Sequence, residues 1–140
     1  EHTQRLIALA FSGDREELLR FGWGLNVSAA FAADASNWER YSDMAHYMPA
    51  AIGTLIAQMQ AVAGHDTSAR LGQIRAATLV IHGTEDQMVP FSNAALIAYR
   101  IEGARLEVLD AVGHLFFLER PERSAELLRE HAQTAAQPVI

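Results

Sequence analysis

The sequence predicts an α/β fold in which two parallel strands with flanking helices follow an all-helical segment. From residue 73 onward, strand-like runs at 77–81 and 105–109 each precede a helix-like segment. A connection through a helix makes two such strands parallel. Residues 1–72, in contrast, are rich in Ala, Leu, Met and aromatic side chains and contain no strand-like run. We therefore expect a helical lid over 1–72 and a strand–helix–strand–helix unit over 73–140.

Capping and breaking residues set the helix boundaries that we expect in the lid. Asp14 lies ahead of two glutamates and is a candidate N-cap. Ser36 is followed three residues later by a glutamate, which is a capping-box pattern. Gly22 and Gly24 are expected to break helices, and Pro49 is expected to open one. The candidate helices are 3–11, 14–22, 25–33, 37–47 and 50–63.

The two predicted strands differ in pattern. Residues 77–81 are apolar at almost every position, which is typical of a strand in a parallel sheet covered on both faces. Residues 105–109 alternate between charged and apolar side chains, which fits an edge strand of the same sheet. Ser92 or Asn93 is expected to cap the intervening helix, and Pro121 is expected to open the final one.

Composition excludes several classes of protein. The formal net charge of the 140 residues is −6, whereas nucleic acids and anionic membranes bind basic surfaces. The sequence has no cysteine, and therefore no disulfide framework and no thiolate ligand or nucleophile. No apolar run reaches the roughly 20 residues of a membrane span, and residues 1–4 lack the pattern of a signal peptide. We expect a cytoplasmic protein with neither nucleic acid nor membrane as its partner.

A carboxylate and an imidazole follow the two predicted strands. Asp86 comes five residues after Ile81, and His114 comes five residues after Leu109. Because ligands bind beyond the carboxyl ends of parallel strands, which lie ~4.8 Å apart, we expect both side chains at one edge of the sheet. A carboxylate there can fix the tautomer of an imidazole and stabilise its cation. Gly113 is expected to let the backbone turn sharply before the imidazole.

These two loops resemble the acid and base loops of the α/β-hydrolase family. Residues 83–90, Gly-Thr-Glu-Asp-Gln-Met-Val-Pro, match the family's G-x-x-D-x-x-V-P acid loop. Residues 109–114, Leu-Asp-Ala-Val-Gly-His, resemble its base loop, as do the following residues 117–122. The separation of 28 residues between Asp86 and His114 is also that of the family.

The resemblance is close over residues 65–131, where the sequence is similar to bacterial enol-lactonases and esterases of the family. Residues 1–64 resemble the family's helical lid with less specificity. The implied fold is the C-terminal part of an α/β-hydrolase. The implied roles are those of a Ser-His-Asp triad, with Asp86 as the orienting acid and His114 as the general base.

The resemblance also implies a nucleophile that we do not find in this sequence. In the family, a serine on a G-x-S-x-G turn precedes the acid, and the oxyanion hole is built from backbone near that serine and in an earlier loop. None of the serines here has glycine both two residues before and two residues after it. The serines are Ser12, Ser28, Ser36, Ser42, Ser68, Ser92 and Ser124. We therefore expect the nucleophile and the oxyanion hole outside residues 1–140, and this sequence to be the second half of the enzyme.

Other interpretations of these polar residues stay open. Asp86 has a structural alternative, as the cap of a turn before Pro90. Glu85 is the rival carboxylate, but its spacing from Gly83 fits the motif less well, and we expect it to be solvated. His82, at the end of the first strand, is expected to be a packed, hydrogen-bonded residue rather than a base.

Some lid residues are candidates for the lining of an apolar substrate pocket, with helix core as the alternative. These candidates are Trp23, Phe31, Trp38 and Met59. Three histidines, His46, His65 and His131, have no partner at metal-ligand spacing. We therefore expect no metal and no cofactor.

Two hypotheses of function follow. In the first, the chain belongs to a serine hydrolase of small carboxylic esters or lactones; carbon–carbon hydrolases, haloperoxidases and dehalogenases share the two loops, so the reaction class stays open. In the second, the chain is an inactive fragment or an assembly module that retains the Asp and His loops. Because the 77–81 strand would have one unpaired side, we expect a homodimer, or association with the missing N-terminal half.

Overall fold

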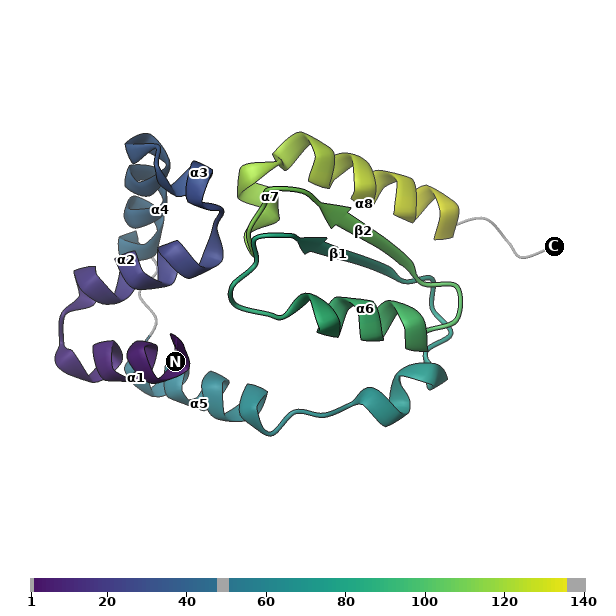
Figure 1. Ribbon diagram of the computed structural model, residues 1–140, viewed down its shortest axis with the longest axis horizontal. Coiled ribbons are helices and arrows are strands. Elements are labelled where there is room, and N and C mark those ends of the chain that lie inside the picture. Colours follow the sequence, from purple (N-terminus) through teal and green to yellow (C-terminus); the bar gives the residue numbers. More distant parts are fainter. Residues whose placement is uncertain (1, 48–50, 136–140) are drawn as a thin grey trace. The chain divides into compact units, whose positions relative to one another are not determined.

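The computed structural model describes residues 2–47 and 51–135 of the chain (Figure 1). The chain forms two compact units. The first consists of Glu1–Leu25 and Ala29–Asp66, and the second of Asn26–Ser28 and Thr67–Ile140. The second unit therefore includes Asn26–Ser28, which lies within the predicted lid. The rest of the second unit begins at Thr67, ahead of the boundary that the sequence predicts between residues 72 and 73.

In its described part, the first unit contains helices and no strand. They are α1 (His2–Ser12), α2 (Arg15–Asn26), α3 (Ala29–Ala32), α4 (Ala35–Tyr47) and α5 (Ile52–Ala63). Asp14 caps α2 as predicted, since its Oδ1 accepts a hydrogen bond from the Glu17 amide at 2.8 Å. The prediction of Ser36 as the cap of α4 is wrong. Asp34 takes this role, because its Oδ1 accepts from the Ser36 amide at 2.9 Å, and hydrogen bonds from Ser36 lower the Asp34 pKa. The helix start predicted at Pro49 lies outside the described residues.

The largest departure from prediction lies around the end of α2. Gly22 and Gly24, predicted to break helices, both lie inside α2. Trp23 between them is only 5% exposed, and its burial outweighs the cost of about 1 kcal/mol for each glycine in a helix. The predicted helix over 25–33 is interrupted: α2 continues to Asn26, Val27 and Ser28 lie outside the helices, and only Ala29–Ala32 forms α3. Asn26–Ser28 belongs to the second unit.

An aromatic cluster organises the first unit. The ring centroid of Trp23 lies 4.7 Å from that of Tyr41 and 5.8 Å from that of Phe31. Trp38 lies 6.2 Å from Trp23 in an edge-on arrangement. Aromatic pairs at such separations contribute about 0.5–1.5 kcal/mol beyond the area that they bury. Burial raises the pKa of the Tyr41 phenol, which is consistent with a cluster that excludes water.

The second unit contains a two-stranded parallel sheet in its described part, as predicted. Its elements are the 3-10 helix η1 (Ser68–Gln73), β1 (Leu79–Gly83), α6 (Phe91–Arg100), β2 (Arg105–Leu109), α7 (Phe116–Glu119) and α8 (Pro121–Ala135). Leu79 pairs with Arg105, and the register runs to Gly83 opposite Leu109. Figure 1 shows the two strands lying between α6 and α8. The carboxyl ends of both strands therefore open at the same edge of the sheet.

Most boundaries in this unit follow the sequence, with three differences. β1 begins two residues later than predicted and extends through Gly83. Neither Ser92 nor Asn93 caps α6. The helix begins directly after Pro90, whose backbone is extended and which makes no side-chain cap. The short helix α7 was not predicted, because its four residues, Phe-Phe-Leu-Glu, are too few to give a helical period.

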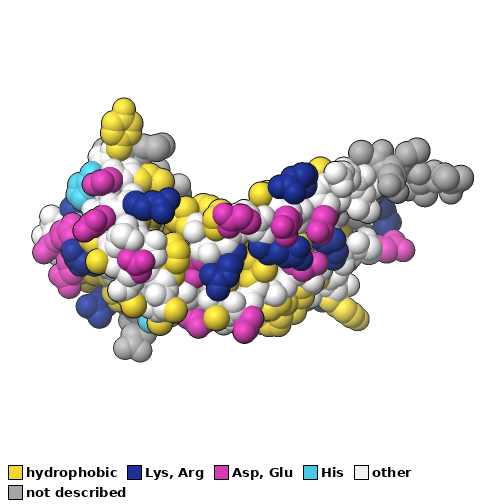
Figure 2. All heavy atoms as spheres, turned by 90° about the horizontal axis from the view of Figure 1, so that it is seen from above, with side chains coloured by type: hydrophobic (Ala, Val, Ile, Leu, Met, Phe, Trp, Pro, Cys, Tyr) yellow, Lys and Arg dark blue, Asp and Glu magenta, His cyan; other side chains and the backbone are white. Residues whose placement is uncertain are grey.

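The charged residues of β2 meet α8 rather than solvent alone. Glu107 lies 3.7 Å from Arg123 of α8, and Arg105 lies 3.3 Å from Glu130 of the same helix. Figure 2 shows basic and acidic side chains gathered side by side over this part of the molecule. The alternation that predicts an edge strand thus reflects an ion-pair layer beneath a helix. Pairs exposed to this extent contribute about 0–1 kcal/mol each, and the layer mainly fixes how α8 lies on the strand.

The loops after the two strands approach each other through their backbones. A β-carbon at Gly83 would collide with the carbonyl oxygen of Val112 and lie 2.5 Å from that of Gly113. Val112 is 1% exposed, so the two loops meet in the interior of the unit. A glycine is therefore required at Gly83, the last residue of β1, because a side chain there would have no room.

Gly83→Ala is expected to destabilise the second unit by about 1–3 kcal/mol, because the added methyl group has no room against rigid backbone. Gly72→Ala is the matched control, since its β-carbon would meet only an ordinary contact at 3.6 Å. Unfolding in urea should be followed by circular dichroism rather than by tryptophan fluorescence. Both tryptophans, Trp23 and Trp38, lie in the first unit and would not report on the second. Equal stability of Gly83→Ala and the unsubstituted chain would contradict this packing.

Candidate active site

The loop after β1 is built around the side chain of Asp86. Its Oδ1 accepts hydrogen bonds from the backbone amides of Met88 at 2.8 Å and Val89 at 2.9 Å. This is the local side-chain-to-backbone turn that aspartate favours. The Asp86 side chain is only 4% exposed. The turn brings the chain to Pro90, after which α6 begins, so the loop has little freedom at either end.

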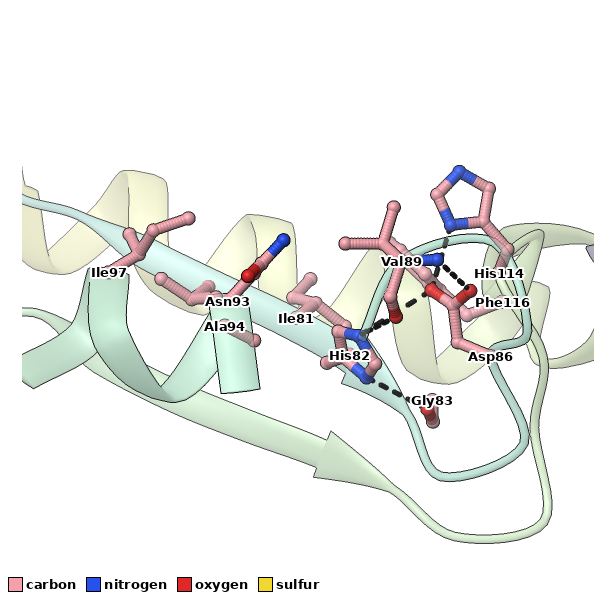
Figure 3. Close-up of a pocket in the computed structure, with 11 residues that line it drawn as sticks. Ile81, His82, Gly83, Asp86, Val89, Asn93, Ala94, Ile97, His114 and Phe116 are labelled. Atoms are coloured by element: carbon pink, nitrogen blue, oxygen red, sulfur yellow. Dashed lines mark hydrogen bonds and ion pairs between the residues drawn. The ribbon is translucent and has the colours of Figure 1, made fainter. Parts of the chain in front are cut away.

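The second oxygen of Asp86 meets the imidazole of His114. The distance from Asp86 Oδ2 to His114 Nδ1 is 2.8 Å, across 28 residues of chain (Figure 3). An ionised carboxylate only accepts, so Nδ1 must donate, and a neutral ring then presents Nε2 as an acceptor. Figure 3 shows the second ring nitrogen pointing away from Asp86. The structure thus brings together the two residues that the sequence selects.

His82 lies beneath this pair and supports the acid loop. It is 6% exposed, and its Nε2 lies 3.1 Å from the Val89 carbonyl oxygen and 3.5 Å from Asp86 Oδ2. Its Nδ1 lies 2.8 Å from the Gly83 carbonyl oxygen. The ring also packs edge-on against Phe91 at 5.5 Å between centroids. His82 is therefore packed and hydrogen-bonded, as the sequence predicts, and it contacts the acid from the side opposite His114 (Figure 3).

The base loop is held by residues that sequence reasoning missed. The Glu119 carboxylate accepts from the backbone amides of Gly113 at 2.8 Å and Ser28 at 2.9 Å. The amide of Leu115 donates to the Asn26 carbonyl oxygen at 2.8 Å. Glu119 lies within residues 117–122, which resemble the family's base-loop region, but that resemblance assigns it no role. Its position directly after the apolar run 116–118 is the signal that could have indicated a buried carboxylate.

Gly113 has a different role from the one predicted. Only Gly13 and Gly103 among the described glycines have positive φ, so Gly113 does not make a sharp left-handed turn. Instead, a β-carbon there would lie 2.5 Å from the Cα of Val27 and 2.8 Å from the Asn26 carbonyl oxygen. Glycine is needed before the imidazole because two backbones touch at this position.

A pocket of about 210 Å³ lies beside the Asp–His pair within the second unit. Figure 3 shows side chains of β1 and α6 along its length, with the pair at one end. The apolar part of its lining is made of Val80, Ile81, Val89, Ala94, Ile97 and Phe116. An apolar cavity that ends in a carboxylate–imidazole pair is a suitable site for a small, largely apolar molecule.

The four lid candidates do not line this pocket. Trp23, Phe31 and Trp38 belong to the aromatic cluster of the first unit. Met59 is half-buried in α5. Their role as substrate contacts stays a prediction. Glu85, the rival carboxylate, is exposed, and it is Asp86 that contacts the imidazole.

Neither a metal-ligand cluster nor a membrane-spanning helix occurs in the part of the chain that the structure describes. Within residues 2–47 and 51–135, no three His, Asp or Glu side chains lie close enough together to hold a metal ion. His46 hydrogen-bonds the Ser42 carbonyl oxygen of its own helix at 2.7 Å. In the same described ranges, no helix combines the length and the apolar character needed to cross a membrane.

Comparison with known proteins relates the chain to esterases. It is 32% identical, over 127 residues, to the pimeloyl-[acyl-carrier protein] methyl ester esterase of Aromatoleum aromaticum. This match covers 91% of the chain and 44% of the esterase. The chain thus spans less than half the length of that relative.

Solved structures have the same fold. An esterase from Exiguobacterium antarcticum matches with a TM-score of 0.79 at 26% identity, over 93% of this chain and 47% of that one. Est816, described as an N-acyl homoserine lactone degrading enzyme, matches with a TM-score of 0.65 at 31% identity, over 89% of this chain and 50% of that one. The predicted fold class, the C-terminal part of an α/β-hydrolase, is confirmed.

The family itself follows from a match along most of the chain. Residues 3–127 match the model of the alpha/beta hydrolase family. This range includes the helices of the first unit, both strands, and the loops that carry Asp86 and His114. The chain belongs to the alpha/beta hydrolase family.

Proposed function

We propose that this chain supplies the acid and the base of a serine hydrolase that acts on small carboxylic esters or lactones. The observation that carries the proposal is the 2.8 Å hydrogen bond from His114 Nδ1 to the buried carboxylate of Asp86. The imidazole itself is 40% exposed. A ring oriented by a buried acid, with its second nitrogen accessible, is the arrangement that general-base catalysis requires.

In the proposed reaction, His114 Nε2 takes the proton of a serine hydroxyl as the serine oxygen attacks the ester carbonyl carbon. The imidazolium then gives this proton to the leaving alkoxide as the carbon–oxygen bond breaks. In the second half, Nε2 takes a proton from water as the water oxygen attacks the acyl carbon. The imidazolium then gives this proton to the serine oxygen as the acyl–serine bond breaks, which releases the acid and restores the serine hydroxyl. Asp86 keeps its negative charge throughout and stabilises the imidazolium through Nδ1.

The serine of this reaction is proposed to lie outside residues 1–140. Ser28 is the serine that the structure brings to the base loop, but it is 2% exposed. Its hydroxyl donates to Glu119 Oε2 at 2.5 Å, so its proton is directed at a carboxylate rather than at the imidazole. The ester or lactone substrate is supported by the esterase and lactone-degrading relatives, and by an apolar pocket beside His114.

The second candidate is an inactive fragment or an assembly module. The observation that favours it is the lack of a G-x-S-x-G serine within residues 1–140. It differs from the first candidate in one respect: no polypeptide would complete the triad. Restoration of ester hydrolysis by a nucleophile-bearing polypeptide from the same reading frame would exclude it.

Residues 1–140 alone are expected to give no turnover of short p-nitrophenyl esters above background, because an Asp–His pair without a nucleophile can only assist water. His114→Ala is the matched control for any residual rate. Turnover that is well above background and is lost in His114→Ala would contradict the placement of the nucleophile outside this chain.

In the complete hydrolase, Asp86→Asn is expected to lower kcat by about 10⁴-fold, the loss seen for an orienting aspartate in a comparable triad. The Asn amide can still accept at one oxygen, but its nitrogen would face His114 Nδ1 as a donor. This would favour the tautomer with its proton on Nε2, which cannot act as a base. Glu85→Gln changes the neighbouring carboxylate, which is exposed, and is expected to leave kcat nearly unchanged.

Amide exchange separates the chemical effect from a structural one. Asp86→Asn should keep protection at Met88 and Val89, because one side-chain oxygen is enough to accept from both amides. Asp86→Ala should lose that protection together with the activity. Comparable kcat losses in Asp86→Asn and Glu85→Gln would overturn the assignment of the acid.

We also propose that the chain associates through the open side of β1. In the described part of the chain, β1 pairs with β2 alone, and an unpaired strand edge is a template for another strand. Light scattering is expected to give a homodimer rather than a 15.4 kDa monomer, unless the nucleophile-bearing polypeptide covers the edge first. A stable monomer with slow amide exchange from Thr78 to Ile81 would contradict this.

A further inference from the structure

Glu119 is a buried carboxylate that the proposed reaction does not use. It lies at the end of α7 and is 6% exposed. Three donors converge on it: the Ser28 amide at 2.9 Å and the Gly113 amide at 2.8 Å on Oε1, and the Ser28 hydroxyl at 2.5 Å on Oε2. Burial of a charge is costly unless hydrogen bonds compensate it. Here the compensation comes from two other segments of the chain.

Both neighbours of His114 are fixed by this arrangement. The amide of Gly113, just before it, donates to Glu119. The amide of Leu115, just after it, donates to the carbonyl oxygen of Asn26 at 2.8 Å. Asn26 is in turn two residues from Ser28, which Glu119 holds through two hydrogen bonds. The Glu119 carboxylate therefore links the Asn26–Ser28 segment to the loop that carries the imidazole.

Packing leaves little room for movement at this point. Gly113 approaches Val27 so closely that a β-carbon would lie 2.5 Å from its Cα. Val27 is 1% exposed. A base must hold its position to within about 0.5 Å, and a displacement of 1 Å can cost about 10²-fold in rate. The hydrogen bonds of Glu119 hold the two backbones in this contact.

We propose that Glu119 is a positioning residue, which locks the backbone around His114 so that the imidazole Nδ1 meets Asp86. This inference rests on the proposed role of His114 as the general base. Glu119 does not touch the imidazole; it acts through the Gly113 amide and through Ser28. The three donors all point at the carboxylate, and only an ionised carboxylate can accept from all of them without donating in return.

The test uses Glu119→Gln in the chain of residues 1–140, with Glu122→Gln as the matched control. Glu122 is exposed and lies three residues further along the chain. Long-range ¹H–¹⁵N spectra of the histidines report which nitrogen of the neutral His114 ring carries the proton. The Nδ1–H form is expected in the unsubstituted chain and in Glu122→Gln. A mixture of tautomers, with faster amide exchange at Gly113, is expected in Glu119→Gln.

A purely structural role would lower the free energy of unfolding but leave the tautomer of the folded protein unchanged. A folded Glu119→Gln variant with His114 fully in the Nδ1–H form would therefore overturn the inference. If Glu119→Gln does not fold, the same spectra of Glu119→Asp test the inference. The aspartate side chain is one methylene shorter, so its carboxylate lies further from the Gly113 amide. A mixture of tautomers in that variant supports the inference, and a pure Nδ1–H form overturns it.

In the complete hydrolase, kcat of Glu119→Gln should fall by up to about 10²-fold with little change in KM. The spectra do not depend on turnover, so this inference and the proposed function fail separately. An inactive hydrolase whose His114 tautomer responds to Glu119 would contradict the function only. An active hydrolase whose tautomer ignores Glu119 would contradict the positioning role only.

Discussion

The geometry of the site depends on three backbone segments in direct contact. The end of β1 lies against the base loop at Val112, and the base loop lies against Val27, with no space for a β-carbon at Gly83 or Gly113. Packed interiors of this density transmit displacements rather than absorb them. The main chain therefore fixes how the acid loop and the base loop face each other, and the hydrogen bond between their side chains forms within that frame.

The two oxygens of Asp86 have separate tasks. Oδ1 accepts from the Met88 and Val89 amides and shapes the loop, while Oδ2 is left for His114. This division explains the spacing of the acid motif. The carboxylate must come two residues before the Met88 amide and three residues before the Val89 amide, because it accepts from both. Glu85 is one residue too early and exposed. His82, which reaches both Val89 and Asp86, adds a second support to the same loop.

The sequence predicts what local patterns and topology determine. The boundaries of β2, the parallel pairing and the adjacency of Asp86 to His114 follow from strand patterns and from the rule that carboxyl ends of parallel strands share an edge. The support around the base does not follow in this way. Ser28 and Glu119 are 91 residues apart, and no periodicity links them. Gly113 was selected correctly, but for conformational freedom, whereas its actual constraint is the tertiary contact with Val27.

The same nonlocal contact explains why the helix predicted over 25–33 fails. Helix propensity there is opposed by backbone groups of Asn26–Ser28 that find partners in the base loop and in Glu119. The chain therefore leaves the first unit after Leu25 and returns to it at Ala29. A division of the sequence at a single position cannot separate a lid from the unit that carries the acid and base. Three residues from the middle of the predicted lid form part of the support for the imidazole.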